Sequence, residues 1–116
     1  MIETTEKSSG DTLGYKASGD ITKADYQTLE PAVEAAIQKY GSVKLLFDLT
    51  DFKWEKVSAW GDDLNFGKQY KDSVEKMALV GDAKWEKHMT RVAGPLYAKE
   101  AKYFENVDDA WDWLNS

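Results

Sequence analysis

An almost uninterrupted run of apolar residues occupies positions 43–49, which read VKLLFDL. Gly41 closes the preceding segment, and the polar pair Thr50 and Asp51 follows the run. A run this short has the length of a strand, and a strand that is apolar at nearly every position must be covered on both faces. Such strands occur in parallel sheets that have helices on each side. The run therefore predicts a central strand in an α/β domain.

Other segments have the composition of neighbouring strands. Residues 77–80 (MALV) form a second short apolar run, and residues 102–105 form a third, weaker one. Residues 13–18 alternate between apolar and polar side chains, which is the period of a half-buried strand, and residues 2–6 are suited to pair with them at the edge. These patterns predict a five-stranded mixed sheet, antiparallel at this edge and parallel elsewhere.

The clearest helical period lies between the second and third predicted strands. Apolar side chains recur every three or four positions from Tyr26 to Tyr40, and Thr22 with Asp25 resembles a capping box. Pro31 lacks a backbone N–H and sits inside this pattern. We expect a short helical turn, a break near residue 28, and a restart with the proline in the first turn.

Helical periods also cover about residues 57–70, 83–96 and the end of the chain. Strands and helices then alternate in the order expected for crossover connections. The sequence therefore predicts one domain over residues 1–116: a mostly parallel, five-stranded α/β fold with about four helices.

The composition excludes several classes of function. The chain has no cysteine, which excludes disulfides, a thiolate nucleophile and zinc sites with sulfur ligands. Its 15 Lys and Arg against 21 Asp and Glu give a net charge of −6, which opposes general nucleic-acid binding. A single histidine gives no support for a metal site, and no cofactor is expected. Without a targeting signal or an apolar run of about 18 residues, the expected location is the cytoplasm.

The chain resembles the SpoIIAA-like family of small bacterial proteins over about residues 12–115. The resemblance is most specific in Met77-Ala-Leu-Val-Gly-Asp82, Lys84-Trp85-Glu86, Pro95, Tyr103-Phe104 and Ala110-Trp111-Asp112-Trp113-Leu114. It implies the fold shared by STAS domains and CRAL-TRIO lipid-carrier domains. Two roles come with that fold: phosphorylation-switched binding of protein partners, and carriage of hydrophobic molecules.

The phosphorylation switch has a counterpart in this sequence, with one departure. STAS antagonists carry a phosphorylatable serine in an Asp-x-Ser turn after the central strand, at the start of the next helix. Here Asp48 and Thr50 occupy the corresponding positions, but Asp51 beside them would repel a phosphate and Lys53 offers partial relief. Thr50 and, further along, Ser58 are the candidate regulatory residues, and the alternative is an ordinary turn after a strand.

The two middle helices carry an unusual number of aromatic side chains. On the helix of residues 57–70, Ala59, Phe66 and Tyr70 form a second apolar patch opposite the core-facing stripe. Such a helix has something other than water on both sides: a nonpolar ligand, a lipid surface, a neighbouring helix across a cleft, a protein partner or a second subunit in a homodimer. The predicted ligand-binding residues are Trp54, Val57, Trp60, Leu64, Phe66, Tyr70, Trp85, Met89 and Val92.

A basic ridge accompanies the second of these helices. Lys84, Lys87 and Arg91 lie on one side of its apolar stripe, as on helices that contact anionic membranes. The alternative is an ordinary amphipathic helix with a solvated basic side.

Catalysis is the poorest hypothesis. Nucleophilic catalysis needs a base, and the one imidazole, His88, flanks an apolar stripe where packing explains it. Asp62 and Asp63 are explained by capping and solvation, so we assign no catalytic residue. The preferred interpretation is a non-enzymatic carrier of a small nonpolar molecule with transient contact to a membrane surface. The alternative is a STAS-type protein-interaction module, and an interfacially acting hydrolase comes third.

Overall fold

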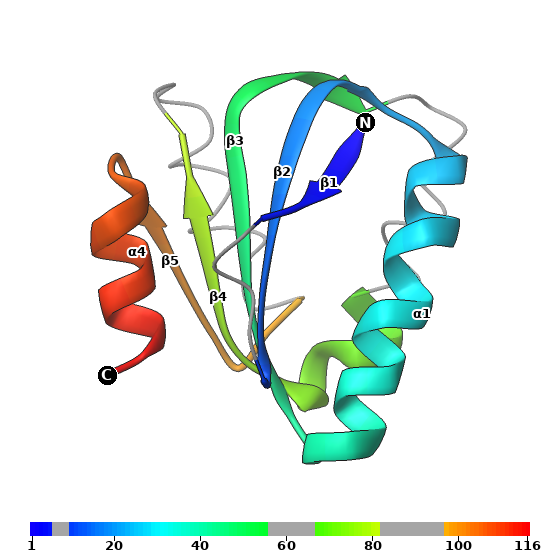
Figure 1. The fold of residues 1–116 in the computed structure, drawn as a ribbon, viewed down its shortest axis with the longest axis vertical. Helices are drawn as coiled ribbons and strands as arrows, with labels where there is room; N and C mark the ends of the chain where they lie inside the picture. The colour runs from blue at the N-terminus through cyan, green and yellow to red at the C-terminus, as the bar shows by residue number, and fades with distance from the viewer. Residues whose placement is uncertain (6–9, 56–66, 82–96) are drawn as a thin grey trace.

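The computed structural model describes residues 1–5, 10–55, 67–81 and 97–116. Figure 1 shows a sheet between helices. Along the chain the elements are β1 (Ile2–Thr4), β2 (Thr12–Ile21), α1 (Lys23–Tyr40), β3 (Val43–Glu55), the 3-10 turn η1 (Lys71–Ser73), β4 (Val74–Val80), β5 (Glu100–Phe104) and α4 (Val107–Leu114). Residues 67–70 are also helical. The predicted helix of residues 83–96 and most of that of residues 57–70 lie outside the described residues.

The sheet has the predicted topology. Its five strands follow one another in the order β1-β2-β3-β4-β5. The β1–β2 pair is antiparallel and the remaining three pairs are parallel, so the mixed, mostly parallel sheet is confirmed. β1 ends at Thr4, two residues earlier than predicted, and β5 begins two residues earlier than predicted, at Glu100.

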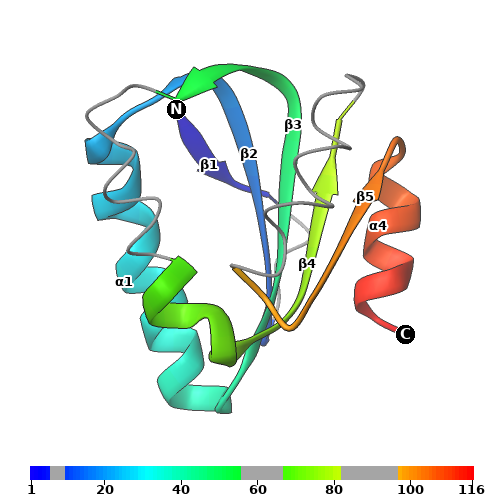
Figure 2. The same ribbon diagram turned by 180° about the vertical axis from the view of Figure 1, so that it is seen from behind.

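β3 is the central strand and is covered on both faces, as its apolar run predicted. Val43 and Leu45 are fully buried with the core on the α1 side, whereas Leu46 is fully buried with the residues that pack against α4. Figure 2 shows α1 and α4 on opposite faces of the sheet. The domain therefore has three layers, and β3 supplies side chains to both interfaces.

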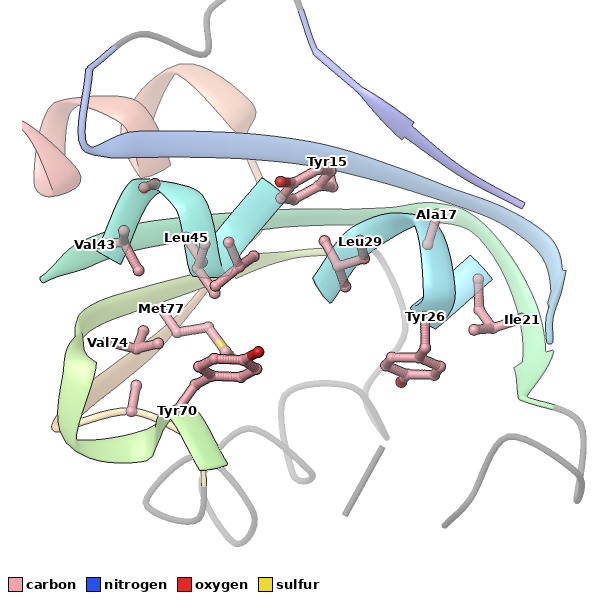
Figure 3. Close-up of a cluster of buried hydrophobic side chains, with 13 residues drawn as sticks. Tyr15, Ala17, Ile21, Tyr26, Leu29, Val43, Leu45, Tyr70, Val74 and Met77 are labelled. Atoms are coloured by element: carbon pink, nitrogen blue, oxygen red, sulfur yellow. The ribbon is translucent and has the colours of Figure 1, made fainter. Parts of the chain in front are cut away.

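The larger core lies on the α1 side. Figure 3 shows Tyr15 and Leu45 from the sheet, Tyr26 and Leu29 from α1, and Tyr70 from the helical turn before β4 around one apolar interior. The rings of Tyr15 and Phe47 stack at 5.7 Å between centroids, which ties β2 to β3 within this core. Burial raises the pKa of Tyr15, as expected for a phenol removed from water.

β3 continues six residues beyond its predicted end. The apolar run stops at Leu49, but the strand extends to Glu55 because β2 provides a partner there. Two register shifts against β2 accompany this extension: β3 has one extra residue between Asp48 and Asp51 and another between Phe52 and Trp54. Backbone pairing, which a hydrophobic pattern does not report, therefore sets the length of the strand.

The predicted break near Thr28 is wrong. α1 is continuous from Lys23 to Tyr40 with Pro31 inside it. Gln27, whose carbonyl loses the hydrogen bond that the proline cannot donate, is exposed together with Pro31, so water can solvate that carbonyl. The buried stripe of Tyr26, Leu29, Val33 and Ala36 continues on both sides of the proline, and its packing holds the helix together.

The start of α1 is fixed by the predicted capping box. The Asp25 carboxylate accepts hydrogen bonds from the Thr22 backbone N–H at 2.8 Å, from the Thr22 hydroxyl at 3.0 Å and from the Ile2 N–H at 3.3 Å. The N-terminal ammonium lies 3.5 Å from the same carboxylate. Desolvation works to raise the pKa of Asp25, but the hydrogen bonds from Thr22 and the ammonium charge outweigh it and hold that pKa below its usual range.

α4 packs against the sheet through a close contact with β2. Ala110, Trp111 and Leu114 form its buried face, and Asn106 caps it by accepting a hydrogen bond from the Asp108 N–H at 2.7 Å. A Cβ atom on Gly14 would lie 2.6 Å from the nearest Trp111 ring atom. The glycine therefore makes room for the indole ring.

The far end of α4 is held by a cation from the sheet. The Lys76 ammonium donates to the Trp113 carbonyl at 3.1 Å and lies 5.2 Å from the centroid of the Trp113 ring. A cation at the carboxyl end of a helix stabilises it because it complements the helix dipole and the unsatisfied carbonyls.

Gly14→Ala should destabilise the fold by about 1–3 kcal/mol, because the added methyl group overlaps Trp111 and the Thr5 hydroxyl. Replacing glycine in a strand would otherwise be neutral or favourable, so the sign of the effect is informative. Urea denaturation of single and double variants provides the measurement. Trp111→Phe removes the overlapping ring atoms and should reduce the cost of Gly14→Ala; equal costs in both backgrounds would contradict this account.

Asp25→Asn should lower stability near pH 7 by about 1 kcal/mol. The folded pKa lies below the unfolded one, so the charged carboxylate stabilises the fold above the unfolded pKa. This contribution is lost as the pH falls from about 4 through the lowered folded pKa. Thermal unfolding against pH should show the two proteins converging in acid. Asp112→Asn, at an exposed position on α4, is the matched control and should follow the wild type.

Candidate functional site

The carboxyl ends of the parallel strands separate at one point. β3 pairs with β4 until Asp48 lies opposite Val80, and then leaves β4 while it stays paired with β2 to Glu55. In Figures 1 and 2 the end of β3 bends away from β4 toward the N-terminal side. Beyond Asp48, β3 therefore no longer lies beside β4, and β2 is its partner among the described strands.

Polar residues gather on this end of the sheet, on the α4 side. Glu3 lies opposite Lys16 in the β1–β2 register, and Lys16 lies opposite Asp48 in the β2–β3 register. β3 has one extra residue against β2 between Asp48 and Asp51, and in this stretch Thr50 donates hydrogen bonds to the Asp48 side chain, which adds Thr50 to this row. Glu3 and Thr50 are exposed, and Lys16 and Asp48 are half-buried. We call Glu3, Lys16, Asp48 and Thr50 the polar sheet end.

Asp48 and Thr50 are the best-defined pair in the polar sheet end. The Asp48 carboxylate oxygen Oδ1 accepts a hydrogen bond from the Thr50 hydroxyl at 2.7 Å and another from the Thr50 N–H at 3.0 Å. One carboxylate oxygen therefore fixes both the hydroxyl and the backbone of an exposed threonine. The arrangement directs the hydroxyl proton toward Asp48 and leaves the threonine accessible from solvent.

A phosphate on Thr50 would disrupt this pair. Esterification removes the hydroxyl donor, and a phosphate carries close to two negative charges beside the Asp48 carboxylate. The unmodified and phosphorylated chains would therefore present different surfaces. The surroundings differ from the predicted ones in one respect: Thr50 lies within β3, five residues before the strand ends, and not at the start of a helix.

Tyr70 requires a correction. The helical wheel placed it on a second apolar face opposite the core, whereas its side chain is 5% exposed and lies in the core with Val74 and Met77. The helix ends at Tyr70 and the chain enters η1, so a constant helical period does not apply at this residue. Burial, and then the negative charges of Glu34 and Glu30 on α1, raise the pKa of Tyr70.

Most of the other predicted site residues fall in the segments that the structure does not describe. Trp54 lies near the end of β3, opposite Asp20 of β2 in the register. His88, Asp62 and Asp63 lie outside the described residues. So do the remaining ligand-binding, membrane-surface and regulatory candidates, which are Val57, Ser58, Trp60, Leu64, Phe66, Lys84, Trp85, Lys87, Met89, Arg91 and Val92.

Few large hydrophobic side chains are exposed among the described residues. Within the described ranges they are Met1, at 58%, which precedes β1, and Tyr40, at 45%, which ends α1. None of the helices found there is long and apolar enough to span a membrane. No group of three potential metal ligands occurs in the same part of the chain.

Sequence reasoning missed Lys16 and Glu3. Each is an ordinary polar residue in an alternating strand, and their proximity to Asp48 depends on the register of three strands. Register is set by long-range pairing, which local patterns do not encode. The alternation did contain one signal: Lys16 occupies a polar position of the period that predicted β2.

Comparisons with known proteins identify the class and then the family. The fold is that of the anti-sigma factor antagonist SpoIIAA. Its unphosphorylated form matches with a TM-score of 0.70 at 11% identity, covering 100% of this chain and 99% of that one. The phosphorylated Bacillus cell fate determinant SpoIIAA matches with a TM-score of 0.65 at 12% identity, covering 98% and 99%.

A family model described as SpoIIAA-like matches residues 12–115, and the chain belongs to this family. An uncharacterised protein with a SpoIIAA-like fold from Shewanella loihica is 31% identical, with a TM-score of 0.84 over 97% of this chain and 93% of that one. No curated protein matches the sequence. The STAS part of the predicted resemblance is thus confirmed, whereas the comparisons give no support to the CRAL-TRIO likeness, to lipid carriage or to membrane association.

Asp48→Ala should speed amide hydrogen exchange at Thr50 by about fivefold, since one hydrogen bond contributes about 1 kcal/mol. Exchange measured residue by residue by NMR tests this expectation. Asp112→Ala, an exposed change on α4, should leave the Thr50 rate unaltered. A Thr50 amide that exchanges equally fast in the wild type and in Asp48→Ala would show that the carboxylate does not hold this backbone in solution.

Proposed function

We propose that this chain is a non-enzymatic protein-interaction module of the STAS kind, which contacts a regulatory protein partner through the polar sheet end. The observation that carries the proposal is the Asp48–Thr50 pair, in which an exposed hydroxyl is held 2.7 Å from a carboxylate. It has the Asp-x-hydroxyl spacing of the STAS antagonists, and it lies where the pairing of the central strand with β4 ends. The fold shared with the anti-sigma factor antagonist SpoIIAA supports the same class of function.

The class of partner follows from the chemistry of this surface. Glu3, Asp48 and the Thr50 hydroxyl offer hydrogen-bond acceptors, and Lys16, the one cation of this surface, lies between Glu3 and Asp48 in the strand register. A surface of fixed polar groups suits a protein, since protein interfaces use about one hydrogen bond per 100–200 Å². Phosphorylation of Thr50 would reorganise this surface through charge repulsion from Asp48 and so control binding.

Thr50→Val should weaken binding at least about tenfold, which corresponds to about 1.4 kcal/mol. The measurement is calorimetric titration of the purified chain with each anti-sigma factor of its native host. The valine keeps the shape of the side chain and removes the hydroxyl, which leaves Asp48 with the backbone N–H of residue 50 and without the hydroxyl donor. Thr4→Val, at an exposed threonine of β1, is the matched control and should bind as the wild type does.

A second measurement tests the regulation and the competing carrier function. Intact mass spectrometry of the chain purified from its native host should show a fraction heavier by one phosphate, and Thr50→Val should remove that fraction. The proposal would be wrong if the anti-sigma factors all failed to bind while the native chain carried a stoichiometric lipid. That result would favour the nonpolar carrier instead.

A further inference from the structure

The outer edge of β5 is the longer of the two edges that the described sheet presents. β5 ends the sheet with five residues, Glu100–Phe104, whereas the opposite edge strand, β1, has three. The β4–β5 register runs without a shift from Lys76 opposite Glu100 to Val80 opposite Phe104. β5 is therefore a regular edge strand without a bulge or a proline, which are two common ways of blocking an edge.

The backbone direction of β5 follows from its pairing with β4. The Phe104 carbonyl accepts a hydrogen bond from the Gly81 N–H at 3.1 Å, so Phe104 turns its carbonyl toward β4. Alternation along a strand then turns the N–H and C=O of Ala101 away from β4. Within the described ranges no strand pairs with this side of β5. The edge thus offers a backbone donor and acceptor at Ala101 for one more strand.

Two exposed charges flank Ala101. Glu100 and Lys102 lie at i and i+2 on one face, and the Lys102 ammonium lies 5.4 Å from the Phe104 ring centroid on that face. An antiparallel copy of β5 with Ala101 at the twofold axis would place Glu100 opposite Lys102 of the partner subunit. Symmetry repeats this pair, so one register creates two ion pairs across the edge.

Other registers of the same two strands are less favourable. A twofold axis at Glu100 would place two carboxylates face to face, and an axis at Lys102 would do the same with two ammonium groups. Like charges directly opposite one another destabilise a strand pair. A twofold axis at Tyr103 would place Lys102 of one copy opposite Phe104 of the other, and Glu100 would then have no cation opposite it. The charges of β5 therefore complement those of a second copy in one arrangement.

We propose that the chain forms a homodimer by antiparallel pairing of β5 with β5 of a second copy, with Ala101 at the twofold axis. The two sheets then join into one continuous sheet of ten strands. This interface is separate from the polar sheet end, which lies on β1, β2 and β3. Binding of a regulatory partner and dimerisation can therefore succeed or fail independently.

Sedimentation velocity over a range of concentrations should show a reversible dimer of the wild type. Lys102→Glu should raise the dissociation constant at least about tenfold. It places a carboxylate at position 102 opposite Glu100 of the partner subunit, and the twofold axis repeats this repulsive pair. Glu100→Lys should do the same with two cations. The double variant Glu100→Lys with Lys102→Glu restores complementary charges and should dimerise as the wild type does. Ala101→Pro removes the outward N–H at an edge position that tolerates proline, so it should give a folded monomer.

A cross-linking experiment tests the register. Because the chain has no cysteine, single-cysteine variants report specific contacts. An equal mixture of Glu100→Cys and Lys102→Cys should form a disulfide-linked heterodimer on mild oxidation, whereas each variant alone should stay largely unlinked. A wild type that is monomeric at its highest soluble concentration would overturn the proposal and leave this edge to a strand of another protein. So would a dimer that is unaffected by Lys102→Glu and Ala101→Pro.

Discussion

Burial of β3 on both faces is the interaction on which the other elements depend. Val43, Leu45 and Leu46 are completely buried, and the first two contribute to a different interface from the third. Neither helix layer can form its core without this strand, because α1 packs on one set of its side chains and α4 on the other. Both neighbours of β3 are parallel strands, and parallel strands are joined by crossovers that place helices on the faces of the sheet, which produces the three-layer arrangement.

The candidate site lies where β3 continues beyond its pairing with β4. Up to Asp48, β3 has a strand on each side, and beyond it β2 is its only partner among the described residues. At that point Thr50 is exposed while Asp48 fixes its hydroxyl. The fold provides the position, and two residues of the sequence provide the chemistry.

The sequence predicted the elements whose signals are local. The run at residues 43–49, the capping box of Thr22 and Asp25, and the alternation before residue 18 each depend on neighbouring residues, and each appears in the structure. The continuity of α1 through Pro31, the extension of β3 to Glu55 and the burial of Tyr70 depend on partners elsewhere in the chain. For the same reason Asp48 and Thr50 were found from their spacing, whereas Lys16 and Glu3 became part of the site only through strand register.

The length of β3 has a mechanical consequence. β3 has thirteen residues, and Figure 1 shows that it bends over the end of the sheet toward the N-terminus. The register shifts against β2 accommodate this curvature. Its first half is clamped between two strands, and its second half is attached along one side. A load applied beyond Thr50 is therefore resisted by β2 alone among the described strands, and β2 leads directly into the capped start of α1.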